Sequence, residues 1–204
     1  SDSVPLNAML MAALHNVVAG QLLIEGGGSW FVPVTLRGAL TLPSDEMNHA
    51  SGIYISLPGH AEGAAIQQQL SEAVRSNEHW WMWHQARLVV TLGGQWLVNR
   101  LLPLMQQRQY LGSFSSMGEW KIDWQGSGYP EDALMWGVAP GSPAYPVAAC
   151  WLICNGRLVL VLKLNAVLGL GAERCRSLMK SWQRAVLGSL SNQIDATSGE
   201  KCNA

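Results

Sequence analysis

The sequence predicts an α/β fold in which a mixed, largely antiparallel sheet is covered by helices, and three observations support this. Apolar residues recur at helical spacing near both ends of the chain, from Leu6 and from about Ala172. Short runs rich in apolar and β-branched residues, typical of strands, lie between these helices at 31–37, 53–57, 147–154 and 157–164. The dipeptide Asn155-Gly156 separates the last two runs and favours a tight hairpin, because both residues tolerate positive φ angles.

The first half of the chain is predicted to form a helix, two strands and a long helical stretch. The opening helix is expected to be amphipathic and to end near Gly20. The strand at 31–37 contains Pro33, which favours an edge position or a bulge because proline cannot donate a ladder hydrogen bond. The strand at 53–57 alternates apolar with polar residues, as a half-buried strand does. Helical spacing then returns from residue 61 to about residue 107.

The C-terminal third is expected to be rich in strands and to close with a helix. The runs 147–154 and 157–164 are almost continuously apolar, so both are predicted to lie inside the sheet with both faces covered. A further strand is predicted at 134–138. The closing helix carries apolar residues at helical spacing, and the residues beyond it are polar and small. Residues 1–190 therefore form a single subdomain in this interpretation, and residues 191–204 a disordered tail.

Composition excludes several classes of function. The chain has 204 residues, of which 49% are hydrophobic and 13% charged, against about 25% charged residues in an ordinary soluble domain. A surface with so few charges is expected to be covered in part by something else. The net charge is -1, and the 13 Lys and Arg residues are dispersed, so we expect no nucleic-acid or anionic-membrane partner. Polar residues interrupt the most apolar tract, which predicts no transmembrane segment, and a cytoplasmic location is expected.

Cysteine and histidine spacing predicts neither a disulfide framework nor a metal site. The four cysteines are Cys150, Cys154, Cys175 and Cys202. None of them forms a Cys-x-x-Cys pair, and four thiols in 204 residues favour a reducing compartment. His79 and His84 are five residues apart, which does not place both rings on one metal ion as a spacing of three or four would. We expect buried thiols rather than reactive ones, and no metal.

Five short motifs follow one another in an order that resembles a known family. They are Pro5-Leu6-Asn7-Ala8 in the opening helix, Val32-Pro33-Val34-Thr35-Leu36-Arg37, Asn48 ahead of the segment 52–58, Ser115-Ser116-Met117-Gly118, and Asn155-Gly156-Arg157-Leu158. This succession resembles the C-terminal half of the condensation-domain and wax-ester-synthase branch of the chloramphenicol-acetyltransferase-like superfamily. Two positions depart from the family pattern: Ala8 stands where Asp is usual, and Ser116 where Asn is usual.

The resemblance implies an acyltransferase that moves an acyl group from a thioester to an alcohol or amine. In that family the base is the second histidine of a His-His-x-x-x-Asp-Gly motif in the N-terminal half. None of the five histidines of this chain has a histidine neighbour or an aspartate four residues later. The resemblance therefore implies that this chain supplies one wall of the substrate tunnel and holds no catalytic residue of its own.

The same resemblance suggests five residues that contact substrate. Ser115 and Ser116 would face the tunnel and stabilise an oxyanion, with plain turn formation as the favoured alternative for both. Arg37 and Asn48 would lie beside the tunnel, with ordering of a neighbouring loop as the alternative. Trp83, in the aromatic run 79–84, would wall an acyl channel, with ordinary core packing as the alternative.

Two functions from different classes remain open. In the first, the chain is the C-terminal half of an acyltransferase, and its partner is the N-terminal half of the same protein or a separate subunit. We then expect no tightly bound cofactor, an acyl-coenzyme A or acyl-carrier-protein thioester as the donor substrate, and a small-molecule acceptor. In the second, the chain is a non-catalytic binding or assembly module that retains the acyltransferase-like fold.

Overall fold

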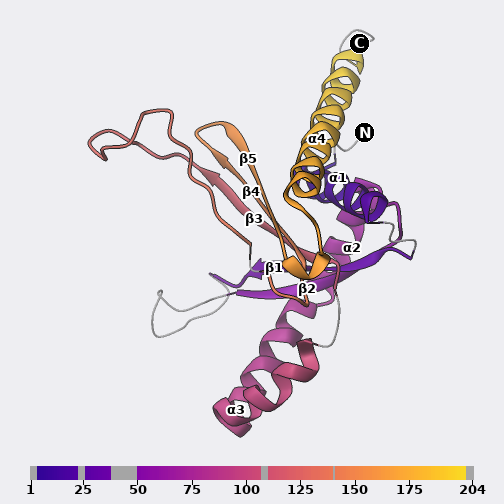
Figure 1. Cartoon of the computed structure of the whole chain (residues 1–204), viewed down its shortest axis with the longest axis vertical. Helices are drawn as coiled ribbons and strands as arrows, with labels where there is room; N and C mark the ends of the chain where they lie inside the picture. Colours follow the sequence, from indigo (N-terminus) through magenta and orange to yellow (C-terminus); the bar gives the residue numbers. More distant parts are fainter. Residues whose placement is uncertain (1–3, 23–25, 38–49, 107–109, 140, 201–204) are drawn as a thin grey trace. The chain divides into compact units, whose positions relative to one another are not determined.

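The computed structural model describes residues 4–22, 26–37, 50–106, 110–139 and 141–200 (Figure 1). Four α-helices, five strands and one short 3-10 helix occur in these ranges. In chain order they are α1 (Leu6–Gln21), β1 (Gly28–Thr35), β2 (Ala50–Leu57), α2 (Gly63–Arg75), α3 (Glu78–Gln106), β3 (Gly112–Trp120), β4 (Val147–Cys154), β5 (Arg157–Leu164), η1 (Ala166–Leu168) and α4 (Ala172–Glu200).

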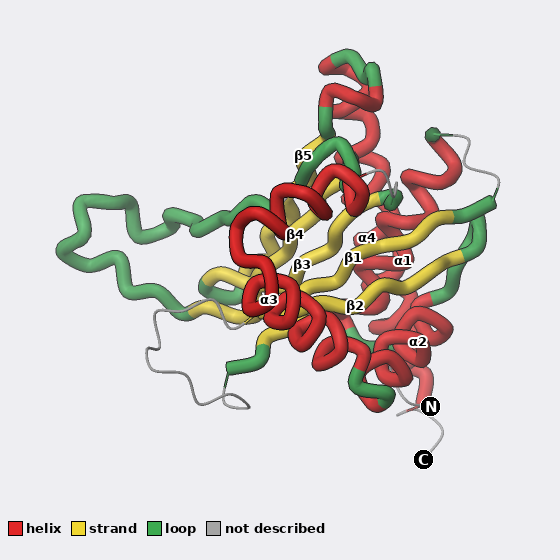
Figure 2. Tube along the Cα trace, turned by 90° about the horizontal axis from the view of Figure 1, so that it is seen from below, coloured by secondary structure: helices red, strands yellow, loops and turns green. Residues whose placement is uncertain are grey.

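The five strands form one mixed sheet in the order β2-β1-β3-β4-β5 (Figure 2). The β1–β3 and β3–β4 ladders are parallel, and the β4–β5 ladder is antiparallel. The predicted α/β class and mixed sheet are confirmed, with a larger share of parallel pairing than the sequence predicted. Parallel strands need a long crossover connection, and the chain between β3 and β4 is long enough to provide one.

The chain divides into two compact units, and the single subdomain over residues 1–190 stays a prediction. The first unit comprises Ser1–Ser29, Ile55–Ala73 and Gly169–Ala204. The second comprises Trp30–Tyr54 and Val74–Leu168 and holds β3, β4, β5 and α3. Helix α4 continues to Glu200, into the segment that the sequence predicted to be a disordered tail.

The first unit is built around α1, which the structure buries on nearly all sides. Residues from Ala8 to His15 are all buried, so the helix is not amphipathic as the sequence predicted. Helix α4 packs along it, and the fully buried Trp182 donates its indole N–H to the carbonyl of Leu10 at 3.1 Å. A helix that is apolar all round has to be covered on several faces, which explains why α1 lies in the core of its unit.

The buried His15 links α1 to the end of β2. Its ring is fully buried, and its Nε2 atom hydrogen-bonds the carbonyl oxygen of Pro58. Burial lowers the pKa of His15 from its ordinary value of 6.5, the hydrogen bond to Pro58 opposes this, and the nearby His60 lowers it further. Because burial disfavours the charged form, the imidazole of His15 is held in its neutral form inside the unit.

The second unit contains the hairpin that the sequence predicted. Strands β4 and β5 pair antiparallel from Val147 with Leu164 to Cys154 with Arg157. Asn155 and Gly156 have φ angles of 49° and 76°, as a type I′ turn requires. The Asn155 side chain also donates to the carbonyl of Ile122 at 3.0 Å and accepts from its N–H at 2.8 Å, which fastens the chain after β3 to this turn.

Three local predictions were wrong, and each has a physical reason. Strand β5 lies at the edge of the sheet and is only half-buried, so an apolar run did not distinguish an edge strand from a central one. Strand β1 is interior despite Pro33, since its described pairing with β3 involves Trp30 and Phe31 and needs no N–H at Pro33. The segment 134–138 is described but pairs with no strand.

We expect Gly156→Ala to destabilise the protein by about 1–2 kcal/mol, because a Cβ atom disfavours the left-handed backbone that this turn position adopts. Gly188→Ala is the matched control, since Gly188 lies inside α4 with open space around its Cα. That substitution should stabilise the protein by about 1 kcal/mol, because alanine favours a helix interior. Chemical denaturation of both variants measures the difference, and equal effects of the two would contradict the assignment of the turn.

The lowered pKa of His15 predicts that stability falls as the pH drops below 6.5. In that range the unfolded chain binds a proton that the folded protein resists, so the free energy of unfolding decreases until the pH reaches the lowered folded pKa. His15→Gln should make this pH dependence shallower, whereas the exposed His84→Gln should leave it unchanged. Urea denaturation between pH 5 and 8 gives the slopes, and an identical slope for His15→Gln and the parent protein would refute the prediction.

Candidate functional site

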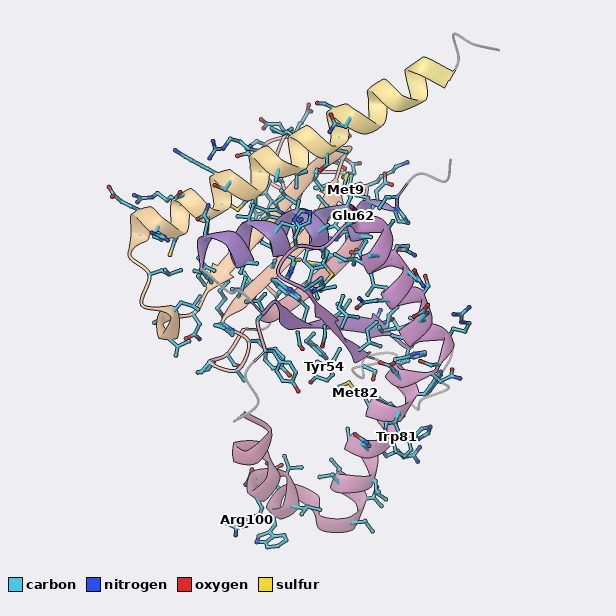
Figure 3. All side chains as sticks on the ribbon, turned by 90° about the vertical axis from the view of Figure 1, so that its right-hand side faces the viewer. Met9, Tyr54, Glu62, Trp81, Met82 and Arg100 are labelled. Carbon is cyan, nitrogen blue, oxygen red and sulfur yellow. The ribbon has the colours of Figure 1, made fainter. Side chains whose placement is uncertain are left out.

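A cavity of about 400 Å³ lies within the second unit. The described residues that line it are Phe31, Tyr54, Met82, Ser113, Gly141, Ser142 and Tyr145. They come from β1, β2, α3, β3 and the segment that precedes β4. In Figure 3 the side chains of Tyr54 and Met82 lie next to each other. Residues far apart in the sequence therefore meet around one space.

The register of the parallel strands brings these residues together. Gly112 of β3 lies opposite Val147 of β4. Tyr110 precedes Gly112 by two residues, and Tyr145 precedes Val147 by two residues. Their rings stack with centroids 5.1 Å apart and an interplanar angle of 5°. On the other side of β3, Ser113 lies opposite Phe31 of β1.

Three tyrosines and a phenylalanine form an aromatic cluster at the cavity. The ring of Tyr54 stacks on Tyr110 with centroids 4.6 Å apart, and the hydroxyls of Tyr54 and Tyr145 are 2.8 Å apart. Phe31 meets Tyr54 and Tyr145 at 5.3 and 5.7 Å between centroids, in tilted geometry. Tilted and offset ring pairs of this kind stabilise beyond the area they bury. We call Phe31, Tyr54, Tyr110 and Tyr145 the aromatic cluster; its packed rings form one wall of the cavity.

Burial keeps the phenols of Tyr54 and Tyr145 protonated. It is the largest cause that raises the pKa of Tyr54 above its ordinary value of 10.0, followed by the hydrogen bond to Tyr145 and the negative charge that an ionised Tyr145 or Tyr110 would place nearby. Burial likewise raises the pKa of Tyr145. Both groups are therefore neutral at physiological pH and can donate hydrogen bonds.

The cavity can bind and orient a neutral group, but its described lining offers no base. The lining residues within the described ranges include no Asp, Glu, His, Lys or Arg. Phenols with raised pKa values do not take up protons at neutral pH, and serine hydroxyls need a neighbouring base before they become nucleophiles. The arrangement is that of a binding wall with hydroxyl donors.

The two predicted serines lie on the strand that borders the cavity. Ser115 pairs with Cys150 and is half-buried, while the exposed Ser116 accepts a hydrogen bond from the Gly118 N–H at 3.4 Å. Neither belongs to the described lining, whereas the buried Ser113 does. Because side chains alternate along a strand, Ser113 shares its face with Ser115 and not with Ser116. A substrate role for Ser115 and Ser116 stays a prediction.

Of the other three predicted site residues, the two that the structure describes, Arg37 and Trp83, are not in the described lining of the cavity. Arg37 is exposed just after β1, and its backbone N–H donates to the Thr35 hydroxyl at 3.3 Å. Asn48 lies outside the described residues. Trp83 is half-buried on α3, and the adjacent Met82 lines the cavity instead. Their roles stay predictions.

Sequence reasoning missed the tyrosine cluster. Tyr54 lies in a predicted strand, and Tyr110 and Tyr145 each lie next to one, which is the only local signal that connects them. A phenol at such a position is commonplace, and no sequence spacing shows that residues 54, 110 and 145 meet. The missing information is the register of strands joined by long connections.

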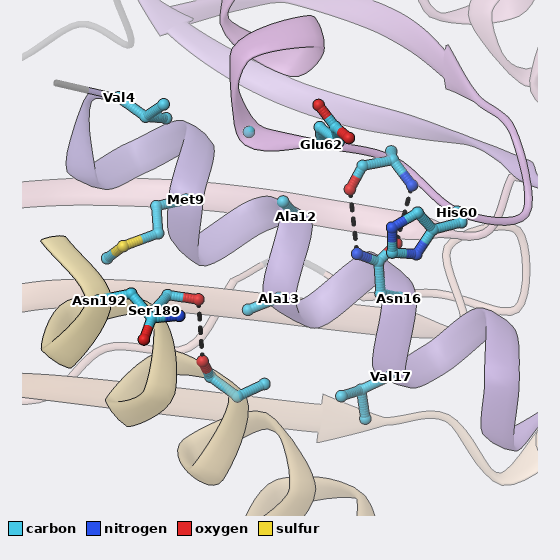
Figure 4. A pocket seen from close by; sticks show the side chains of 13 residues that line it. Val4, Met9, Ala12, Ala13, Asn16, Val17, His60, Glu62, Ser189 and Asn192 are labelled. Carbon is cyan, nitrogen blue, oxygen red and sulfur yellow. Dashed lines mark hydrogen bonds between the residues drawn. The ribbon is translucent and has the colours of Figure 1, made fainter. Parts of the chain in front are cut away.

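The first unit has a separate cavity of about 560 Å³ between α1, α4 and the segment 60–63 (Figure 4). Asn16 faces this space, and its side-chain amide forms two hydrogen bonds with the backbone of Ala61, at 2.9 and 3.0 Å. These bonds fasten the segment after β2 to α1. We interpret this cavity as a packing gap between elements that these structural contacts hold together.

The comparisons with known proteins support the fold. No protein-family model and no curated protein matches this sequence. Among solved structures, the chain is similar to the epimerization domain from the third module of tyrocidine synthetase B, with a TM-score of 0.55 and 18% sequence identity. The similarity covers 91% of this chain and 42% of that chain, so this protein spans less than half of the solved domain.

That neighbour is a relative, in fold, of condensation domains and chloramphenicol-acetyltransferase-like enzymes. The likeness therefore confirms the predicted condensation-domain-like half fold.

Over the described ranges, none of the helices combines the length and apolar character needed to cross a bilayer.

We predict that stability also falls at high pH, because the folded protein keeps protons on Tyr54 and Tyr145 that the unfolded chain loses above pH 10. The contribution is complete below pH 10 and is lost progressively as the pH rises from 10 toward the raised folded pKa values. Tyr54→Phe should make the alkaline decline of the free energy of unfolding shallower. Tyr129→Phe is the control, because Tyr129 is 66% exposed and lies outside the cluster. Steeper or unchanged decline in Tyr54→Phe would show that the cluster does not hold its protons.

Proposed function

We propose that this chain is the C-terminal half of an acyltransferase and supplies one wall of its substrate tunnel. The observation that carries the proposal is the difference between the two coverages. The similarity to the solved epimerization domain covers 91% of this chain but 42% of that domain. The remainder of the fold would come from the N-terminal half of the same protein or from a partner subunit. The motif order from the opening helix to the Asn155-Gly156 hairpin supports assignment to the C-terminal half.

The proposed reaction moves an acyl group from a coenzyme A or carrier-protein thioester to an alcohol or amine. The acceptor oxygen or nitrogen attacks the thioester carbonyl carbon while a base removes its proton, and the C–S bond then breaks to release a thiol. The base would be a histidine of a His-His-x-x-x-Asp-Gly motif on the other half. The described cavity lining of this chain, which holds hydroxyl donors and no imidazole, suits the complementary task of holding substrate.

Exposed apolar residues on α3 support a partner. Five of them have large exposed fractions: Trp81 at 66%, Leu88 at 57%, Val90 at 58% and Leu92 at 73% before the kink at Gly94, and Trp96 at 73% after it. Contiguous apolar surface on a soluble protein commonly marks an interaction site. In this proposal the other half of the acyltransferase covers these residues. The same observation favours the second candidate function, a non-catalytic assembly module, so an activity measurement has to separate the two.

The chain by itself should release no thiol above background when mixed with acyl-coenzyme A and a panel of alcohols and amines. Adding the N-terminal half that carries the His-His-x-x-x-Asp-Gly motif should restore turnover. Replacing the second histidine of that motif by Ala should then lower the rate by roughly 100-fold or more, as loss of a general base does.

Three outcomes separate the candidate functions. Turnover by the isolated chain would contradict the division of labour between two halves. A complex that forms on mixing but never turns over would favour the assembly module. Turnover that depends on both the complex and the motif histidine would support the acyltransferase.

A further inference from the structure

We propose that the 400 Å³ cavity binds a small, neutral aromatic molecule or acyl group that carries a hydrogen-bond acceptor, and that Tyr54 and Tyr145 hold this acceptor. The inference deepens the proposed function, on which it rests for the role of the site, by naming the chemical class of its substrate. It concerns binding alone and requires no second half, no thioester and no turnover.

The described part of the lining disfavours charged ligands. The described residues around the cavity carry no ionisable carboxylate, ammonium, guanidinium or imidazole, and the two tyrosines stay neutral. A carboxylate or ammonium that entered would lose its hydration without meeting an opposite charge, which is far more costly than the transfer of a neutral group. A neutral ligand loses only those hydrogen bonds to water that the cavity does not replace.

The hydroxyl arrangement leaves one donor for a ligand. Each phenol brings one proton, and the 2.8 Å contact between Tyr54 and Tyr145 uses one of the two. Two phenols therefore share one contact, and one hydroxyl proton is left over. A carbonyl oxygen is a suitable partner because it accepts without having to donate.

The apolar surfaces favour a ring. Phe31, Tyr54 and Tyr145 present aromatic faces and edges to the cavity, where a planar ligand adds to tilted and stacked pairs already in place. The thioether of Met82 completes the wall and makes favourable contacts with aromatic ring edges. The volume lies near the low end of the range of about 300–1,000 Å³ for small-molecule sites, which suits one ring and a short substituent rather than a long acyl chain.

Four matched probes test the three requirements separately. Acetophenone has the ring and the neutral acceptor, ethylbenzene lacks the acceptor, benzoate carries a charge, and cyclohexyl methyl ketone lacks the aromatic ring. Titrating each into the full chain, followed by ligand-observed NMR and calorimetry, should show saturable one-to-one binding of acetophenone. The other three should bind at least about fivefold more weakly, which corresponds to the loss of one ordinary hydrogen bond or ring contact.

A double variant locates the site. Tyr54→Phe combined with Tyr145→Phe keeps both rings but removes both hydroxyls, and this variant should weaken acetophenone binding by about fivefold while leaving ethylbenzene unaffected. Tyr129→Phe, remote from the cavity lining, should bind acetophenone as the parent protein does. Circular dichroism shows whether each variant is folded. Ring protons of bound acetophenone should also give nuclear Overhauser contacts to the methyl group of Met82.

The outcomes are distinct from those of the acyl-transfer test. Absence of saturable acetophenone binding, equal affinity for benzoate, or equal loss in Tyr129→Phe would overturn this inference and leave the acyltransferase proposal standing. Binding as described, together with no turnover in the presence of the motif-bearing half, would overturn the acyltransferase proposal and leave the ligand class standing. If the folded double variant that combines Tyr54→Phe with Tyr145→Phe binds acetophenone at full affinity, the tyrosine pair does not hold the ligand.

Discussion

The parallel β3–β4 ladder is the constraint on which the site depends. Its register places Gly112 against Val147 so closely that a Cβ atom on Gly112 would lie 1.9 Å from the carbonyl oxygen of Val147 and 2.8 Å from the ring of Trp30. Only glycine accommodates this approach, because the contact is with backbone that cannot swing aside. The residues before each partner are thereby set side by side, and the stacked rings of Tyr110 and Tyr145 follow from that register.

The central position of β4 explains why this register is rigid. Seven of its eight residues are buried, and it is paired along its length with β3 on one side and β5 on the other. The Asn155-Gly156 turn ends β4, and the Asn155 side chain ties it to the segment after β3. A one-residue slip of β4 would exchange the residues on its two covered faces and displace the Asn155-Gly156 turn, so the packing on both faces and the turn both oppose it. The same interactions that stabilise the strand therefore hold Tyr145 in place.

The sequence predicts what depends on local chemistry. Asn155 and Gly156 predict their hairpin because the need for positive φ lies in the residues themselves, and the helical spacing from Ala172 predicts α4. The motif order also predicts the condensation-domain-like half fold that the solved neighbour confirms. What the sequence does not contain is the position of a strand within its sheet. For that reason two predictions were wrong: the apolar β5 is an edge strand, and β1 is interior despite Pro33.

The candidate site shows the same limit more sharply. Ser115 and Ser116 were predicted from a motif, yet the serine of β3 that lines the described cavity is Ser113, two residues earlier on the face that Ser115 shares. A motif fixes the segment, whereas the pairing of β1 with β3 decides which residue of that segment faces Phe31. The contact between the hydroxyls of Tyr54 and Tyr145 spans 91 positions of the chain. No local pattern reports a contact of that kind.

The chemistry of the cavity also bears on how a two-part enzyme would divide its work. Residues that hold a neutral substrate best are phenols kept protonated by burial, and such groups are poor proton acceptors at neutral pH. Placing an imidazole base among them would bring in a group that becomes charged, and burial would lower its basicity in the way that it lowers the pKa of His15 in the other unit. Recognition and proton removal therefore favour opposite surroundings. A fold that meets both needs gains by setting them on separate walls, with the neutral wall selecting the substrate and the other wall taking its proton.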